Sequence, residues 1–354
     1  MKKNLGLREA MFYSPTPLAA AKALRCKLCN HYCIIPEGKE GLCLVRKNIS
    51  GKLYCINWGK AVSLNLDPIE KKPFFHFKPG SSVLSFGTPG CNFRCLNCQN
   101  WDLSQGVKEF GKTILDEINT ITPQQIVESA IKANADGFAY TYSEPTIFFE
   151  YAYDVIMEAR KKKMDAFSCF VSNGYFSKEL FEFIKENKLL QAIRIDLKFI
   201  EDDKYYKITG GRLKPVLENI KQVYKSKIHL EVINLLITDE NDQDYQIEKL
   251  AKEIYSISDE IPLHFSRFFP YYKMSDKIPT PLNRLLNAKK IAQEVGLKYV
   301  YIGNTDIEGA EDTYCPECKT LLIKRNRFFI EKNVFEKNKK PFCPNCNAKI
   351  NIVL

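Results

Sequence analysis

The chain has 354 residues, 45% of them hydrophobic and 27% charged, and its formal net charge is +10. This length and composition allow a full hydrophobic core and exclude a disordered polypeptide. No apolar run reaches the roughly eighteen residues of a membrane helix, and Arg8 and Glu9 interrupt the stretch where a signal peptide would be apolar. We expect a soluble, cytoplasmic protein whose cysteines are reduced and serve as metal ligands or catalytic thiols, apart from Cys55 and Cys169, which stand alone as core or surface thiols.

The N-terminal part carries four cysteines with irregular spacing, Cys26, Cys29, Cys33 and Cys43. Four thiolates satisfy either zinc or an iron–sulfur cluster, and the spacing does not decide between them. Two glycines before the last cysteine supply the turn that would bring it back to the others. The alternative is that these cysteines meet only by chance. We predict a small metal-binding module with a linker in residues 1–80.

A short apolar run at 83–86 predicts the first strand of a larger domain, and a Gly-Thr-Pro-Gly turn follows it. The turn leads to Cys91, Cys95 and Cys98, which are separated by three residues and then two. Three thiolates bind only three irons of a four-iron cluster, so the fourth iron stays open to a substrate or cofactor. A zinc knuckle that lacks one ligand, or three buried core thiols, would explain the group without chemistry. The spacing favours a catalytic 4Fe-4S cluster.

Predicted strands and helices alternate from this first strand onward. Strands are expected at 83–86, 137–142, 166–171, 192–197, 230–237, 263–268 and 298–302, and helices at 123–134, 147–162, 178–187, 215–224, 245–257 and 282–295. The alternation implies an α/β fold of parallel βαβ units, which build either a doubly wound sheet or a barrel. Polar clusters follow nearly every strand, as they do at the mouth of a βα barrel, and this favours a barrel over residues 81–308.

The polar residues at the strand ends are the candidates for a binding site. Glu144 would pair with a cation, the alternative being a surface acid that caps the next helix. Asn173 and the preceding serine offer an amide and a hydroxyl, but they also fit an ordinary turn. Asp196 and Lys198 share one face of their strand, where opposite charges must pair or bind a polar ligand. His264 is either a satisfied core residue or part of the same site.

The C-terminal segment carries two Cys-x-x-Cys motifs, Cys315 with Cys318 and Cys343 with Cys346. Apolar strand material lies between the motifs, a pattern typical of a zinc ribbon. A segment this short could scarcely fold on its core alone, so zinc would supply its folding energy. We predict a closed structural zinc site in residues 309–354.

The three-cysteine loop, with Phe93 between its first two thiols, resembles the signature of radical S-adenosylmethionine (SAM) enzymes. In that superfamily the amino and carboxylate groups of SAM chelate the open iron. One electron from the cluster then breaks a sulfonium bond and releases a 5′-deoxyadenosyl radical. The resemblance implies a partial (βα)6 TIM-like barrel and a one-electron donor of the flavodoxin or ferredoxin type.

The order of the candidate residues is similar to that in the pyruvate formate-lyase activating enzyme group. The N-terminal cysteines and the segment Tyr301-Ile-Gly-Asn304 make the chain resemble the radical enzyme of the AmmeMemoRadiSam system, whose name records an association with AMMECR and Memo proteins. The resemblance implies that SAM is approached by Tyr142, Glu144, Ser172, Asn173, Asp196, Lys198 and His264. One departure is that Tyr-Ser-Glu stands here in place of the Gly-Gly-Glu of the activating enzymes.

We therefore predict an oxygen-sensitive enzyme that cleaves SAM reductively and abstracts hydrogen from a substrate, with a protein partner favoured over a small metabolite. The competing interpretation is a binding protein whose zinc modules and basic excess hold nucleic acid on a barrel scaffold. A third interpretation keeps the radical chemistry and makes the N-terminal site a second iron–sulfur cluster that relays electrons.

Overall fold

The computed structural model describes residues 7–17 and 22–354 and has a mixed α/β fold with parallel strands. The chain divides into two compact units. The first unit holds the described residues up to Leu66, together with Val83–Gln191 and Tyr206–Gly211. The second unit holds Asp67–Ser82, Ala192–Tyr205 and Arg212–Leu354.

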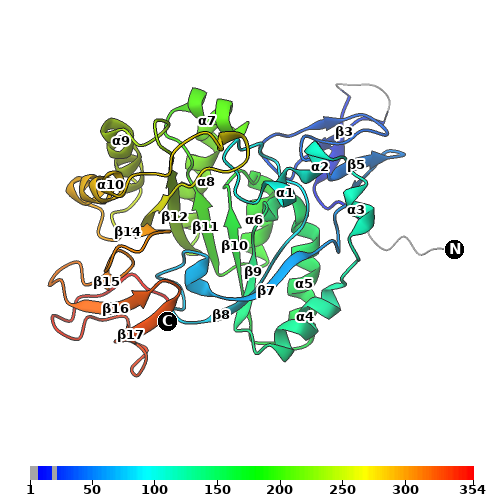
Figure 1. Cartoon of the computed structure of the whole chain (residues 1–354). Helices are drawn as coiled ribbons and strands as arrows, with labels where there is room; N and C mark the ends of the chain where they lie inside the picture. The colour runs from blue at the N-terminus through cyan, green and yellow to red at the C-terminus, as the bar shows by residue number, and fades with distance from the viewer. Residues whose placement is uncertain (1–6, 18–21) are drawn as a thin grey trace. The chain divides into compact units, whose positions relative to one another are not determined.

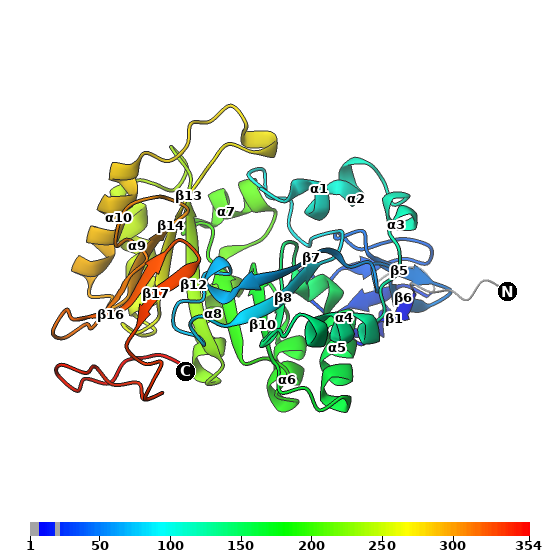
Figure 2. The same cartoon turned by 60° about the horizontal axis from the view of Figure 1, so that its bottom comes forward.

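The first unit is built on parallel strands, and its longer α-helices alternate with them along the chain. The strands are β8 (Ser82–Gly87), β9 (Gly137–Tyr140) and β10 (Phe167–Ser172), and the helices are α4 (Pro123–Lys132), α5 (Phe149–Lys161) and α6 (Lys178–Glu186). Strand β7 (Val62–Pro68) lies beside β8 (Figure 2). Pairing in register places Phe86, Tyr140 and Phe170 side by side, with ring centroids 5.3 and 5.5 Å apart. Buried strands of this kind are apolar on both faces, which explains their uninterrupted apolar runs.

The N-terminal part of the first unit forms two small antiparallel sheets. One sheet has the order β1 (Arg8–Glu9), β6 (Lys52–Cys55), β5 (Arg46–Ile49), and the other has the order β2 (Tyr13–Pro15), β3 (Leu24–Cys26), β4 (Ile34–Ile35). Arg46 and Glu150 of α5 form an ion pair in which both side chains are almost completely buried. This pair fixes the small sheets to a helix that lies about a hundred residues later in the chain.

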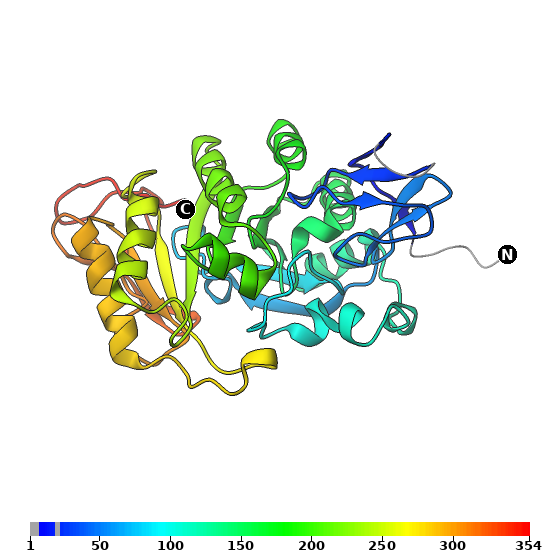
Figure 3. The same ribbon diagram turned by 90° about the horizontal axis from the view of Figure 1, so that it is seen from above.

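The second unit has its own set of parallel strands, in the order β11 (Ala192–Asp196), β12 (His229–Leu236), β13 (Leu263–Arg267), β14 (Val300–Gly303). Its helices include α8 (Leu213–Lys225), α9 (Asp244–Tyr255) and α10 (Leu282–Val295). Helices α9 and α10 pack side by side (Figure 3). A row of residues in register runs across the strands from Asp196 through Ile233 and His264 to Tyr301.

The C-terminal segment of the second unit forms a three-stranded antiparallel sheet (Figure 1). Its strands are β15 (Thr313–Tyr314), β16 (Leu321–Asn326) and β17 (Phe329–Asn333). Leu322, Ile323 and Phe335 form a small core with Tyr299 and Ile350. Cys315 and Cys343 belong to this core, so a metal held by them would lie directly beside it.

Every strand and helix expected between residues 83 and 303 is present, and most boundaries agree within two or three residues. The prediction of an α/β fold with parallel strands is confirmed. The structure adds short helices after the cysteine loop, α1 (Trp101–Ser104), α2 (Gly106–Glu109) and α3 (Ile114–Glu117), and a further helix, α7 (Asp202–Thr209). The structure also contains three one-turn 3-10 helices, η1 (Ile69–Lys71), η2 (Pro145–Phe148) and η3 (Tyr272–Met274). In the part of the chain that the structure describes, no helix has the length and apolar character needed to cross a membrane.

Candidate active site

The three-cysteine loop follows β8 and is held by main-chain hydrogen bonds. Cys91 and Cys95 are buried, and Cys98 is half-buried. The loop pairs with the 208–209 segment, because Arg94 N donates to Thr209 O at 2.8 Å and Leu96 N donates to Ile208 O at 3.1 Å. These bonds fix the backbone between the thiols.

A lysine supports the same loop from α2. The Lys108 ammonium donates to the carbonyl oxygens of Cys91 at 2.9 Å and Phe93 at 2.6 Å. Burial raises the pKa of the Cys91 thiol, and the Lys108 charge acts in the opposite direction. A cation beside thiols favours their ionised form, which is the form that binds metal.

Two glycines allow close approach to the loop. A Cβ on Gly211 would lie 2.4 Å from ring atoms of Phe93, so only glycine leaves room for that ring. Gly90 has φ +103°, and a Cβ there would lie 2.8 Å from a methyl carbon of Val45 and 3.3 Å from the carbonyl oxygen of Cys43. The cysteine loop is therefore packed on one side against the N-terminal part of the first unit.

Glu144 is a buried carboxylate that receives only neutral hydrogen-bond donors. Its oxygens accept from Thr146 N at 3.0 Å, Ser172 Oγ at 2.8 Å and Asn173 N at 2.7 Å. No residue that the structure describes forms a salt bridge with it. Burial raises the pKa of Glu144, although these donors and the Thr146 hydroxyl, which also donates to it, lower it in part. A buried carboxylate with no protein cation is suited to receive a cation from a ligand.

Asn92 connects this carboxylate network with the cysteine loop. Asn173 Nδ2 donates to Asn92 Oδ1 at 2.7 Å, and the ring nitrogen Nε2 of His31 lies 2.9 Å from the Asn92 carbonyl oxygen. The sequence predicted Glu144, Ser172 and Asn173 as site residues but did not single out Asn92. Its position directly after the first cysteine was the available signal.

Tyr142 and Ser143 stand at the two positions where the resemblance to the activating enzymes implies glycines. Tyr142 has φ +63°, the left-handed region that glycine adopts most easily. Asn100 Nδ2 donates to the Tyr142 carbonyl at 3.0 Å, and Ser143 Oγ donates to Thr88 O at 2.7 Å. These two bonds hold the backbone in the conformation that glycines would otherwise favour.

In the second unit, Asp196 and Lys198 lie together as their spacing predicted. The Asp196 carboxylate accepts from Lys198 Nζ at 3.0 Å and from Arg194 Nη2 at 2.5 Å. Although burial alone would raise the pKa of Asp196, the two cations lower it below its ordinary value. The charges are paired within the protein, and their approach to SAM stays a prediction.

His264 belongs to a buried polar cluster around Glu231. Its Nε2 lies 2.7 Å from Glu231 Oε2, while Oε1 lies 3.0 Å from His229 Nε2 and accepts from the main-chain N–H of His76 at 2.8 Å. The His264 ring stacks on Tyr301 with centroids 5.1 Å apart. These contacts match the core-residue interpretation of His264, and a contact with SAM stays a prediction.

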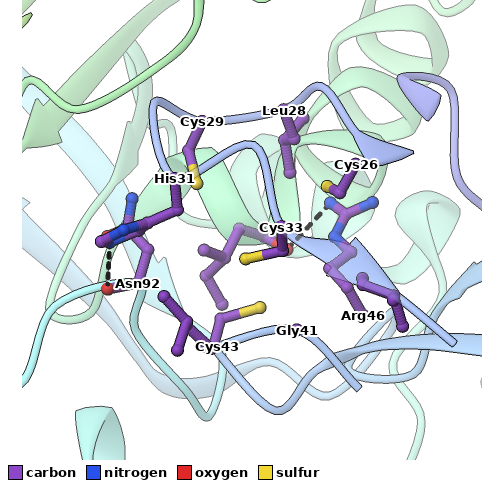
Figure 4. Close-up of a pocket in the computed structure, with 12 residues that line it drawn as sticks. Cys26, Leu28, Cys29, His31, Cys33, Gly41, Cys43, Arg46 and Asn92 are labelled. Atoms are coloured by element: carbon purple, nitrogen blue, oxygen red, sulfur yellow. Dashed lines mark hydrogen bonds between the residues drawn. The ribbon is translucent and has the colours of Figure 1, made fainter. Parts of the chain in front are cut away.

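The two cysteine quartets differ in geometry. In the C-terminal quartet the sulfur of Cys315 lies 3.6 Å from that of Cys346, and Cys318 lies 3.6 Å from Cys343. All four sulfurs lie within 4.8 Å of one another, so this group can hold a metal ion. The N-terminal cysteines line a pocket in the first unit (Figure 4).

The chain is similar to several known proteins. Residues 86–251 match the family model of the Radical SAM superfamily. An uncharacterized protein of Methanocaldococcus jannaschii is 44% identical over 357 residues, which cover 98% of this chain and 100% of that protein. The pyruvate formate-lyase-activating enzyme of Staphylococcus epidermidis is 22% identical over 204 residues, which cover 55% of this chain and 76% of that enzyme. A radical SAM methyltransferase from Sphaerobacter thermophilus has a TM-score of 0.47 and 14% identity, with 69% of this chain and 71% of that chain covered.

The chain belongs to the radical SAM superfamily. Membership confirms the resemblance that its cysteine loop suggested, and it makes the protein an enzyme. It also implies a 4Fe-4S cluster and SAM as the cofactors.

Proposed function

We propose that Cys91, Cys95 and Cys98 bind the 4Fe-4S cluster and that the enzyme uses it to cleave SAM reductively. When bound, the cluster and SAM supply a 5′-deoxyadenosyl radical that abstracts hydrogen from the substrate. The observation that carries this proposal is the buried Glu144 carboxylate, which is joined through Asn173 and Asn92 to the cysteine loop.

The residues of the first unit have distinct tasks in this proposal. The three thiolates hold the cluster and leave one iron open. Glu144 receives the ammonium of SAM, because a cation would compensate a buried carboxylate that has only neutral donors. Asn173 fixes Asn92, and Lys108 fixes the loop backbone, so the cluster and the carboxylate keep one relative position.

We propose a protein as the substrate, as for an activating enzyme. The support is the 22% identity to a pyruvate formate-lyase-activating enzyme, which by its name activates another enzyme. AMMECR and Memo proteins are the proposed partners, and a flavodoxin or ferredoxin is the proposed electron donor. For the C-terminal quartet we propose zinc, because its sulfur spacing suits one tetrahedral ion.

Anaerobic incubation with dithionite and SAM tests the radical chemistry. The wild-type protein should form 5′-deoxyadenosine, and Cys95→Ala should form none. Glu144→Gln keeps the side-chain shape but removes the charge, so we expect a loss of at least tenfold in SAM affinity, a cost of about 1.4 kcal/mol. Its iron content should equal that of the wild type. Undiminished cleavage by Cys95→Ala would overturn the proposal.

A further inference from the structure

The four N-terminal cysteines converge although they lie on different segments. Cys26 ends strand β3, and its N–H donates to Cys33 O at 2.9 Å, which joins the two segments. Figure 4 shows the sulfurs of Cys29, Cys33 and Cys43 turned toward the same space, with Arg46 beside Cys26. The rest of the wall is mostly apolar and comes from Leu28, Ile35, Leu42 and Ile147.

The spacing of these sulfurs distinguishes between the two metals that four thiolates accept. Zinc lies about 2.3 Å from each sulfur, so the four sulfurs of a zinc site must lie about 3.8 Å apart. Among the described residues, only the C-terminal quartet brings three or more ligand atoms within 4.8 Å of one another. The N-terminal sulfurs are spread more widely. In a four-iron cluster each thiolate binds a different iron, and this separates the sulfurs.

The proposed SAM-cluster cysteines provide an internal comparison. Cys91, Cys95 and Cys98 also fail to come within the 4.8 Å of a compact ion site. The two groups therefore share a wide spacing, in contrast to the C-terminal quartet. Both groups are more open than a single tetrahedral zinc site requires, whereas thiolates that bind different irons of one cluster need not lie as close together.

Two buried donors at the same pocket have no partner. Arg46 is 1% exposed and Asn92 is 4% exposed, and both line the pocket. Arg46 Nε and Asn92 Nδ2 form no hydrogen bond with the rest of the protein. A buried donor without a partner is costly, and an acceptor on a ligand in this pocket would satisfy both atoms. The inorganic sulfides and thiolates of an iron–sulfur cluster are such acceptors, and hydrogen bonds to them tune the reduction potential.

We propose that Cys26, Cys29, Cys33 and Cys43 bind a second 4Fe-4S cluster. Four thiolates leave no iron open, so this cluster carries electrons and binds no substrate. It accepts one electron from a reduced ferredoxin or flavodoxin and passes that electron to the cluster on Cys91, Cys95 and Cys98. This electron-carrying role rests on the proposed function, whereas the identity of the metal does not. Asn92 supports the role, because it lines the pocket and directly follows a ligand of the first cluster.

Metal analysis of anaerobically reconstituted full-length protein tests the proposal. We expect about eight irons and one zinc per chain in the wild type. The triple variant Cys91→Ala, Cys95→Ala, Cys98→Ala should keep about four irons. Dithionite should reduce them to a paramagnetic cluster whose EPR signal does not change when SAM is added. The double variant Cys26→Ala, Cys29→Ala should also keep about four irons, with an EPR signal that SAM changes.

Cys55→Ser is the matched control, because Cys55 is a buried thiol of the same small sheets that does not line the pocket. Its serine keeps a donor to Asn57 Oδ1, and the variant should retain about eight irons. A triple variant with about two zincs and no iron would overturn the second cluster. A cluster that dithionite cannot reduce would overturn its electron-carrying role. If the triple variant keeps its irons but the wild type forms no 5′-deoxyadenosine, the proposed function fails and the second cluster stands.

Discussion

At the scale of the residue, the ion pair between Arg46 and Glu150 joins the N-terminal sheets to helix α5. Arg46 Nη1 donates to Glu150 Oε1 at 2.7 Å, and Nη2 contacts the other carboxylate oxygen. Although burial alone would raise the pKa of Glu150, the Arg46 guanidinium lowers it below its ordinary value. Loss of one partner would leave the other charge buried without compensation, which is far more costly than loss of an exposed pair.

We expect Glu150→Gln to lower the free energy of unfolding by about 3–5 kcal/mol, measured by urea denaturation. Glu158→Gln on the same helix is the control. Glu158 pairs with Lys161, whose side chain is 78% exposed, and such a pair contributes at most about 1 kcal/mol. If both variants lost the same free energy of unfolding, burial would not be the reason for the importance of the Glu150 pair.

At the scale of the element, the cysteine loop depends on a neighbouring segment that has no cysteine. Residues 208–211 supply two main-chain acceptors and the space for Phe93. Gly211→Ala would place a methyl group against that ring, and the loop would have to move. We expect this variant to lose at least half of the iron on the loop after reconstitution, as measured by iron content and by the SAM-sensitive EPR signal.

Gly106→Ala is the control for that substitution. Gly106 begins helix α2 near the same loop, but a Cβ there would come no closer than 3.4 Å to any neighbour. Alanine is also a better helix residue than glycine. The control should bind iron as the wild type does, and an equal loss of iron in both variants would show that the Phe93 contact is not the cause.

The regular elements were predictable because their residues repeat locally. Apolar runs and turn residues indicated the strands from β8 to β14, and cysteine spacing indicated the metal groups. The strands β1 to β6 were missed, since segments of two to four residues carry no period. Helix α7 was missed because it is only eight residues long.

The candidate site was predictable only where its residues follow a strand. Glu144, Ser172 and Asn173 could be found in this way, and the structure joins them in one network. The partners Asn92 and His31 are 61 positions apart, and Arg46 and Glu150 are 104 apart. No local pattern reports such pairings, because tertiary packing alone creates them.

At the scale of the whole molecule, buried histidines make stability depend on pH. His76 is fully buried, with Nε2 2.6 Å from the Tyr301 hydroxyl and Nδ1 beside the Asn351 carbonyl. Burial lowers the pKa of His76 to about 3. An unfolded histidine titrates near 6.5, so below about pH 6.5 the unfolded chain binds a proton that the folded chain does not. Neutral His76 therefore makes its full contribution to the free energy of unfolding above about pH 6.5, and this contribution decreases as the pH falls toward 3.

We expect His76→Asn to reduce this dependence. The side-chain amide can still donate to the Asn351 carbonyl but does not titrate. Between about pH 7.5 and pH 5 the wild type should lose about 2 kcal/mol more unfolding free energy than the variant, measured by urea denaturation at each pH. If the free energy of unfolding changed with pH equally in the two proteins, His76 would not be the cause of the pH dependence.

The C-terminal metal should hold its own segment together without affecting the iron. We expect Cys315→Ser with Cys343→Ser to lose one zinc and to expose residues 313–354 to fast hydrogen exchange, because the metal would join the two ends of this segment. The iron content should stay unchanged. Cys169→Ser, in buried strand β10, is the control, and protection of residues 313–354 without zinc would contradict a structural metal.

Gly90 lies directly before the cysteine loop and packs against Val45 and the Cys43 carbonyl, so the backbones of the two proposed iron sites are in contact there. Oxygen that reaches one of the two sites is therefore close to the other, although each centre is held by its own cysteines. Exposure to air should attack both, and repair would require the iron–sulfur assembly machinery of the cell to rebuild each one.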